Sequence, residues 1–241
     1  MSVSPASVAI AFNNTVAWES GGLVNDRMGT YPALVAWARD SGLFRVEEAA
    51  AIRRREAAKP WRTAAVLAQV RELRAISHQI LAALSRRDLP GEIALRAFNQ
   101  ALGLGTPRLG LEARGGRLGW AHPGETGPEA ILHRVAWNIA LFVTSPELER
   151  LGMCANAECG WLFLDTTKNR SRRWCSMAEC GSRAKARRHY ARKKKAGRGG
   201  RAGGASTPRT ARRRPRGERG LRTLPRERES RERAPEPPEV S

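Results

Sequence analysis

Residues 154–180 read CANAECGWLFLDTTKNRSRRWCSMAEC and contain all four cysteines of this 241-residue chain. The cysteines form two close pairs, each with four residues between its members, and fifteen residues separate the pairs. Two such pairs can place four thiolates at the corners of a tetrahedron, which is how structural Zn²⁺ is held in proteins. The spacing therefore predicts one zinc ion per chain, with the ligands Cys154, Cys159, Cys175 and Cys180.

The residues between and after the cysteines predict a hairpin followed by a helix. Residues 161–164 (WLFL) are expected to form a strand and residues 172–174 the returning strand, with a polar turn over residues 165–169. Ser176 is followed three residues later by Glu179, which is a capping-box sequence, so a helix should begin at Ser176. One cysteine pair at a hairpin and the other at a helix start predict a treble-clef-like zinc finger.

Two other interpretations of the cysteines stay open: an iron–sulfur cluster, although its usual spacings differ, and four ordinary buried thiols. A catalytic zinc is disfavoured, because four cysteines fill the coordination shell and leave no position for a substrate. The sequence shows no paired acids, no nucleophile beside a base and no glycine-rich phosphate loop after a strand. We therefore expect that the protein is not an enzyme.

Positive charge is concentrated at the C-terminal end. Residues 182–241 hold 21 Lys/Arg and 6 Asp/Glu, whereas residues 1–181 hold 22 and 17, and the whole chain has a formal net charge of +20. This asymmetry predicts a polyanionic partner, either nucleic acid or an anionic membrane surface, with a merely solubilising tail as the alternative. No apolar run approaches the ~20 residues of a membrane span, and we find no signal peptide. Four clustered thiols fit a reducing cytoplasm, so we expect a cytoplasmic protein without a membrane partner.

The helix expected after Cys180 carries basic residues as far as Lys195. Arg183 and Arg187 share one face at a spacing of four residues. Because like charges destabilise an isolated helix, a polyanion facing these residues is a natural partner, and a solvated surface is the competing interpretation. The residues predicted to contact nucleic acid are Arg172, Arg173, Arg183, Lys185, Arg187, Arg188 and Arg192.

The first two-thirds of the chain are expected to be mostly helical. Helices are predicted over residues 32–40, 46–56, 60–86, 92–102 and 128–144, with a hairpin over residues 109–122 that turns at Gly115-Gly116. After Gly197 apolar residues almost vanish, which predicts disorder. The expected fold is mainly α, with these domains: residues 1–148, multihelical with a small hairpin; residues 149–195, the zinc finger and basic helix; and residues 196–241, a disordered basic tail.

Asn14, Thr15 and Trp37 form a candidate ligand pocket in the N-terminal domain. The competing interpretation makes Asn14 and Thr15 a helix cap or polar turn and places Trp37 in the core. His78 and His133, isolated on helical patterns, are expected to be structural.

The stretches Cys159-Gly-Trp-Leu-Phe-Leu-Asp165, Arg173-Trp-Cys-Ser176 and Cys180-Gly-Ser-Arg-Ala-Lys185 resemble the CGNR zinc-finger family. Here the tetrapeptide that names the family is Cys180-Gly-Ser-Arg183, with serine in place of asparagine. Upstream, Phe12-x-Asn14-Thr15 and Tyr31-Pro-x-Leu-Val-x-Trp37 resemble the ABATE domain that is usually fused to this finger.

The resemblance implies a bacterial stress-induced transcription regulator. We accordingly expect a zinc-dependent DNA-binding protein of the nucleoid, with duplex DNA as its partner and an N-terminal domain that senses a small-molecule effector or forms a homodimer. An RNA- or ribosome-associated protein is one alternative, because Arg/Gly-rich tails bind RNA. A protein-interaction module, in which zinc only folds a docking surface, is the other.

Overall fold

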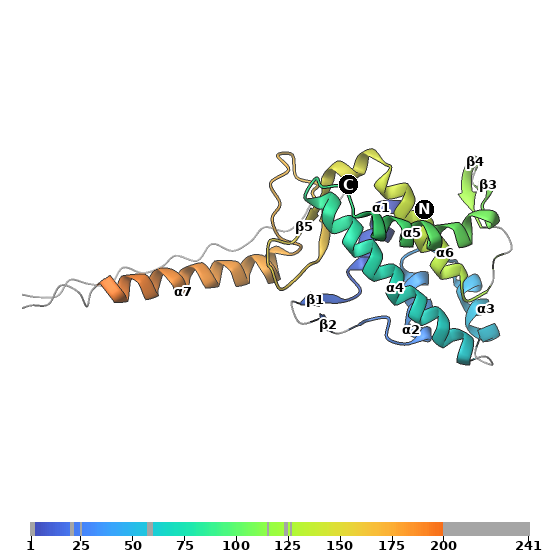
Figure 1. Ribbon diagram of the computed structural model, residues 1–241, viewed down its shortest axis with the longest axis horizontal. Coiled ribbons are helices and arrows are strands. Elements are labelled where there is room, and N and C mark those ends of the chain that lie inside the picture. The colour runs from blue at the N-terminus through green and yellow to red at the C-terminus, as the bar shows by residue number, and fades with distance from the viewer. Residues whose placement is uncertain are drawn as a thin grey trace, which may run out of the picture. The chain divides into compact units, whose positions relative to one another are not determined.

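The computed structural model describes residues 3–19, 22–24, 26–56, 60–114, 116–122, 125 and 127–199. In chain order its helices and strands are α1 (Pro5–Asn13), β1 (Ala17–Glu19), β2 (Gly22–Val24), α2 (Tyr31–Asp40), α3 (Val46–Glu56), α4 (Pro60–Ser85), α5 (Glu92–Gly105), β3 (Gly110–Arg114), β4 (Arg117–Ala121), α6 (Ala130–Val143), β5 (Leu151–Met153), β6 (Leu162–Leu164) and α7 (Ser182–Gly199) (Figure 1). Short 3₁₀ turns cover Thr106–Arg108 and Pro146–Arg150, and a π-helical turn covers Met177–Gly181. The predicted mainly α class is confirmed.

The helix predicted over residues 60–86 is α4, and the apolar stripe along one of its faces points into the core. Val66, Val70, Leu73 and Ile80 are buried, as expected for apolar residues that recur at steps of three and four on one helix face. Burial of this stripe removes the apolar side of a 26-residue helix from water, which is the main source of its stability in the fold.

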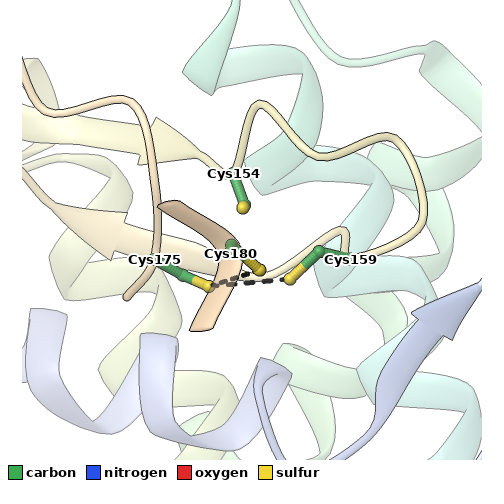
Figure 2. Close-up of side chains that lie close together, drawn as sticks. All are labelled: Cys154, Cys159, Cys175 and Cys180. Atoms are coloured by element: carbon green, nitrogen blue, oxygen red, sulfur yellow. Dashed lines mark hydrogen bonds between the residues drawn. The ribbon is translucent and has the colours of Figure 1, made fainter. Parts of the chain in front are cut away.

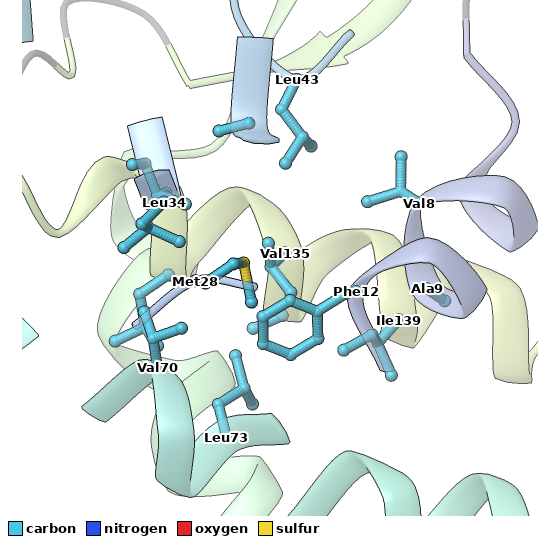
Figure 3. Close-up of a cluster of buried hydrophobic side chains, with 14 of the residues drawn as sticks. Val8, Ala9, Phe12, Met28, Leu34, Leu43, Val70, Leu73, Val135 and Ile139 are labelled. Atoms are coloured by element: carbon cyan, nitrogen blue, oxygen red, sulfur yellow. The ribbon is translucent and has the colours of Figure 1, made fainter. Parts of the chain in front are cut away.

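Helix α6 lies at the centre of the helical core and packs against α1, α4 and α5. In Figure 3, Val135 and Ile139 of α6 lie beside Phe12 of α1, and these three side chains are at most 1% exposed. α1 and the β1–β2 hairpin were not predicted from the sequence, whereas the β3–β4 hairpin was.

The predicted end of α5 at Leu102 is wrong, because the helix continues through Gly103 to Gly105. Gly105 instead permits close packing against α6. A Cβ atom at this position would lie 2.7 Å from the Cβ atom of His133, which is too close for two carbon atoms. Gly105 is therefore the last residue of α5, and its missing side chain also permits a tertiary contact.

Arg74, which the helical pattern places off the apolar stripe, is only 1% exposed. Its guanidinium donates hydrogen bonds of 2.8 and 2.6 Å to the Asp26 carboxylate and one of 2.9 Å to Thr15 Oγ1. Burial acts to raise the pKa of Asp26, but the hydrogen bonds and positive charge of Arg74 hold that pKa below its ordinary value. Arg74 can be buried because the partly exposed Asp26 carboxylate supplies its counter-charge.

The short β5–β6 sheet belongs to the same core as the helices. Leu151 and Leu162 are buried in one cluster with the helical residues, and the segment Met1–Ala196 forms one compact unit. The predicted tail would begin inside α7, which runs to Gly199, and its residues from 200 onward lie outside the described residues. Among the described helices, none combines the length and apolar character needed to cross a membrane.

Candidate metal centre and basic helix

The strand that pairs with β6 is β5, so the predicted return strand at residues 172–174 is wrong. β5 and β6 are antiparallel, with Gly152 opposite Phe163. The Phe163 ring covers Gly152 so closely that a Cβ atom there would lie 2.7 Å from the ring. Cys154 and Cys159 therefore lie in the connection between two paired strands, and residues 172–174 return to the site without forming a strand.

Backbone hydrogen bonds shape the connection that carries the first cysteine pair. The Cys154 N–H donates to the Trp161 carbonyl at 2.8 Å, and the Cys159 N–H donates to the Asn156 carbonyl at 2.9 Å. Gly160 has a φ of 62°, in the left-handed region that glycine adopts without steric cost. This turn brings Cys159 back beside Cys154.

The second cysteine pair lies at a helix start, as predicted. Ser176 is the N-cap residue, and its Oγ accepts a hydrogen bond of 3.3 Å from the Glu179 N–H. The first turn, Met177–Gly181, is π-helical and carries the buried Cys180. A knuckle between two strands facing a helix start is the predicted treble-clef-like arrangement.

The four sulfur atoms converge on one centre (Figure 2). All four lie within 4.8 Å of one another, with 3.6 Å between Cys159 and Cys175 and 3.7 Å between Cys175 and Cys180. A Zn–S bond of about 2.3 Å requires sulfur atoms about 3.8 Å apart at the corners of a tetrahedron. Disulfide sulfur atoms would be only about 2.05 Å apart. The geometry and the donor set therefore fit a closed structural zinc site.

The four cysteine thiols can all be ionised at once only when a cation balances their negative charges. Burial raises the pKa of Cys159 to about 11 and raises the pKa of Cys175 as well. Burial opposes ionisation of Cys154 too, but the N–H groups of Cys175 and Asn156 hold its pKa below the ordinary value. A bound Zn²⁺ would ionise all four thiols and release their protons, so metal affinity falls as the pH is lowered.

Arg172, a predicted nucleic-acid contact, also makes contacts within the metal module. Its guanidinium donates to the carbonyls of Trp174 at 2.9 Å, Leu164 at 3.2 Å and Cys175. It also lies 4.6 Å above the centre of the Phe163 ring. These contacts use three of the five N–H groups of the guanidinium, so Arg172 has a structural role in the module, and its contact with nucleic acid stays a prediction.

Arg187, on α7, bonds to the knuckle that holds the first cysteine pair. Its guanidinium donates a 2.6 Å hydrogen bond to Asn156 Oδ1 and lies 3.6 Å from the Glu158 carboxylate. The Asn156 side chain is buried, and its Nδ2 is 4.0 Å from Cys180 Sγ. Arg187 thus orients a residue that donates toward a metal ligand, a role that sequence spacing alone does not reveal.

Replacing Arg187 by alanine is expected to lower zinc affinity by roughly 10- to 100-fold, the usual effect of removing a residue that orients metal ligands. Competition with a chromophoric chelator measures this affinity. Arg188→Ala removes the same charge from the next position, which is exposed, and is expected to keep the wild-type affinity. Equal zinc affinities for the two variants would contradict the role of Arg187.

The remaining basic residues predicted to meet nucleic acid are exposed and form no ion pair with any carboxylate of the described residues: Arg173, Arg183, Lys185, Arg188 and Arg192. Four of them belong to α7, which begins directly after the metal site. The module therefore presents an uncompensated basic surface on α7, which continues directly from the π-helical turn that carries Cys180.

Asn14, a predicted pocket residue, joins the helical part to the finger. Its side chain donates to the Leu162 carbonyl at 2.8 Å and accepts from the Leu162 N–H at 3.0 Å, as a neighbouring strand would. Nearby, the Trp161 indole N–H donates to the Val16 carbonyl at 2.9 Å. His78 Nε2 lies 2.9 Å from the Gly160 carbonyl, consistent with the expected structural role of His78.

The other two candidate pocket residues also have structural contacts. Thr15 Oγ1 donates to the Phe12 carbonyl at 2.7 Å and accepts from Arg74, and the Trp37 ring lies 5.6 Å from the Phe12 ring. Neither they nor Asn14 line the hollow between α4, α5 and α6 or the one between α2 and α3. These contacts match the polar-turn and core interpretation, in which Asn14 is the cap residue of α1.

Replacing Asn14 by alanine removes the side chain to which the N–H and C=O of Leu162 are hydrogen-bonded. Leu162 is only 1% exposed, so water cannot easily take the place of that side chain. We expect the free energy of unfolding to fall by about 2–3 kcal/mol, since unsatisfied buried groups cost about 1–3 kcal/mol each. Urea titration of the zinc-loaded protein measures the change. Asn99→Ala, at an exposed position of α5, is the control, and an equal effect of both variants would argue against the docking role of Asn14.

Two family models match the sequence of this chain, and one of them covers the cysteine cluster. The CGNR zinc finger model matches residues 150–193, which contain both cysteine pairs and most of α7. The ABATE model, described as "Putative stress-induced transcription regulator", matches residues 6–146, more than half of the chain. Among the curated proteins, none matches the chain.

Proposed function

Because this chain belongs to the ABATE family of stress-induced transcription regulators and carries a CGNR zinc finger, we propose that it is a zinc-dependent DNA-binding regulator. The observation that carries the proposal is the exposed basic surface of α7, which starts at the metal site. One zinc ion per chain would hold that surface, and duplex DNA would be its partner. We propose no catalytic activity, since four cysteines close the coordination shell.

The length of α7 and its attachment to the metal site favour duplex DNA as the partner. A helix of 18 residues is about 27 Å long, and the major groove admits one α-helix. Zinc would anchor the first turn of this helix, so Arg183 projects from a fixed support and can hold a bidentate contact to a guanine edge. Arginines beyond residue 199 would add sequence-independent attraction to phosphate.

The helical part would control the finger, as an effector sensor or as the interface of a homodimer. α6 packs against α1, and the cap residue of α1, Asn14, is hydrogen-bonded to β6 of the finger. A shift of α1 would therefore move the strand that leads out of the first cysteine pair. This contiguous set of contacts supports regulation of DNA binding by the N-terminal domain.

Selection from random duplex DNA with the zinc-loaded full-length protein tests the proposal. We expect one sequence class to be enriched, and binding to be lost when a chelator removes the metal. Single-stranded RNA of the same sequence serves as competitor. Tighter binding of the RNA would favour an RNA- or ribosome-associated role, and no binding of either nucleic acid would leave a protein-interaction module. Crosslinking in the native cell tests association with the nucleoid.

A further inference from the structure

The β3–β4 hairpin projects from the helical part of the chain and exposes apolar side chains (Figure 1). Leu111 and Trp120 lie opposite each other in its register and are 60% and 57% exposed. Trp120 contacts α6 through the Trp137 ring, whose centre lies 5.8 Å from its own. Within the described residues, the only extensive backbone contact of each strand is with the other. An isolated two-stranded sheet is only marginally stable, so further strands would stabilise this hairpin.

The outer edge of β4 offers backbone groups to a further strand. Because the loop has two residues, its flanking residues Arg114 and Arg117 form a hydrogen-bonded pair. The pattern alternates along the strand, so Gly119 bonds toward β3, whereas the N–H and C=O groups of Leu118 and Trp120 point away from β3. No described residue outside the hairpin is hydrogen-bonded to these groups.

Two copies of β4 match each other about a twofold axis at Gly119. In that antiparallel register the backbone of Leu118 faces that of Trp120 in the second copy, so the outward groups of both strands find partners. Each Gly119 faces its own copy, where Cα atoms approach to about 4.5 Å. A Cβ atom on Gly119 would meet no atom of the described residues within 4 Å, so this approach is open. The two Trp120 side chains become diagonal neighbours, within reach of each other.

The charges of the hairpin favour β4 over β3 as the pairing edge. Glu112 lies at the centre of β3, so the same pairing of β3 would place two carboxylates opposite each other, which is destabilising. Charged residues on an edge strand commonly protect it from unwanted pairing. Residues 118–121 of β4 (LGWA) carry no charge. The edge without such protection is therefore the one that is complementary to itself.

We propose that the β4 edge binds a second copy of this chain and forms a four-stranded antiparallel sheet across a twofold axis. This pairing closes the assembly at two copies, whereas pairing of β4 with β3 of the next copy would continue without end. The inference deepens the proposed function by assigning the homodimer interface, and it rests on that function only in that a dimer would present two fingers to one duplex. Self-association itself requires no DNA.

Disulfide trapping with the zinc-loaded full-length protein tests the register. Gly119→Cys places two thiols opposite each other within the Cα–Cα range of disulfides, about 4.4–6.8 Å. We expect a covalent dimer under mild oxidation. Ala113→Cys, at an exposed position of β3 outside the proposed interface, is the control for random collision. It is expected to crosslink at least about tenfold more slowly, because its thiols are not held close together.

Charge substitution at Gly119 tests the interface without added cysteines. Gly119→Glu sets two carboxylates face to face and is expected to weaken self-association by about fivefold, the effect of a like-charge pair across strands. Mixing this variant with Gly119→Lys should restore a dimer, because the facing charges are then opposite. Sedimentation equilibrium measures both results, and Ala113→Glu, which changes the other strand, should leave self-association unchanged.

The proposal is overturned if the wild type stays monomeric at about 0.1 mM, or if both cysteine variants crosslink at the same rate. It is also overturned if charges at Gly119 leave a dimer unchanged, since the interface would then lie elsewhere. A dimer that fails to bind DNA would keep the interface and contradict only the proposed function, whereas a monomer that binds DNA would do the reverse.

Discussion

We expect Cys159→Ser to abolish zinc binding and to lower the thermal stability of the whole described unit. Structural zinc supplies about 10–16 kcal/mol of folding free energy in finger peptides, whereas whole domains are stable by only about 5–15 kcal/mol. Serine cannot replace the thiolate, so the knuckle and the first turn before α7 should unfold. This is the largest effect that one substitution is expected to have on the stability of this chain.

The loss should not stay within the finger. Leu151 and Leu162 belong to the core that contains the helices, and Asn14 is hydrogen-bonded to β6. When the finger unfolds, these buried groups lose their partners, and the helical transition should move to lower temperature. Elemental analysis is expected to find one zinc per wild-type chain, and circular dichroism follows the transition.

Ala157→Ser changes an exposed residue two positions before Cys159 and is expected to keep both zinc and stability. Wild-type protein without metal, or a Cys159→Ser variant that still holds zinc, would contradict the metal centre. A helical transition that stays unchanged after loss of zinc would show that the shared core contributes little.

The second large effect concerns the charges of α7. The variant replaces four exposed basic residues by glutamine, a good helix former: Arg183, Lys185, Arg188 and Arg192. We expect duplex DNA affinity to fall on the order of a thousandfold at about 0.1 M salt, because each lost phosphate contact changes the salt slope by about 0.9. Sequence preference should also weaken, since base contacts cost roughly 1–3 kcal/mol each.

A matched control removes four arginines from the region beyond residue 199: Arg212, Arg213, Arg214 and Arg216. This control should weaken binding to all duplexes alike and leave the preference among sequences unchanged. Fluorescence anisotropy over a range of salt concentrations measures both quantities. If the α7 variant binds like the wild type while the control loses affinity, α7 is not the DNA-reading element.

The sequence by itself determined the features that depend on neighbours along the chain. The cysteine spacing predicted the ligand set, and the capping box predicted the helix start at Ser176, because both patterns act within a few residues. The periodicity of α4 predicted its buried face for the same reason. A bound zinc ion would restrict the conformations of residues 154–180 further, because it needs all four cysteines as ligands at once.

Only the tertiary structure decided which distant groups meet. β5 has three residues and no strong strand pattern, so its pairing with β6 depends on the core that both strands cover. Arg74 is buried because Asp26, 48 residues earlier, supplies its counter-charge. Asn14 reaches β6 across 148 residues, a contact that no local pattern reveals. Such contacts depend on the packing of whole elements, whose energy is not contained in any local pattern.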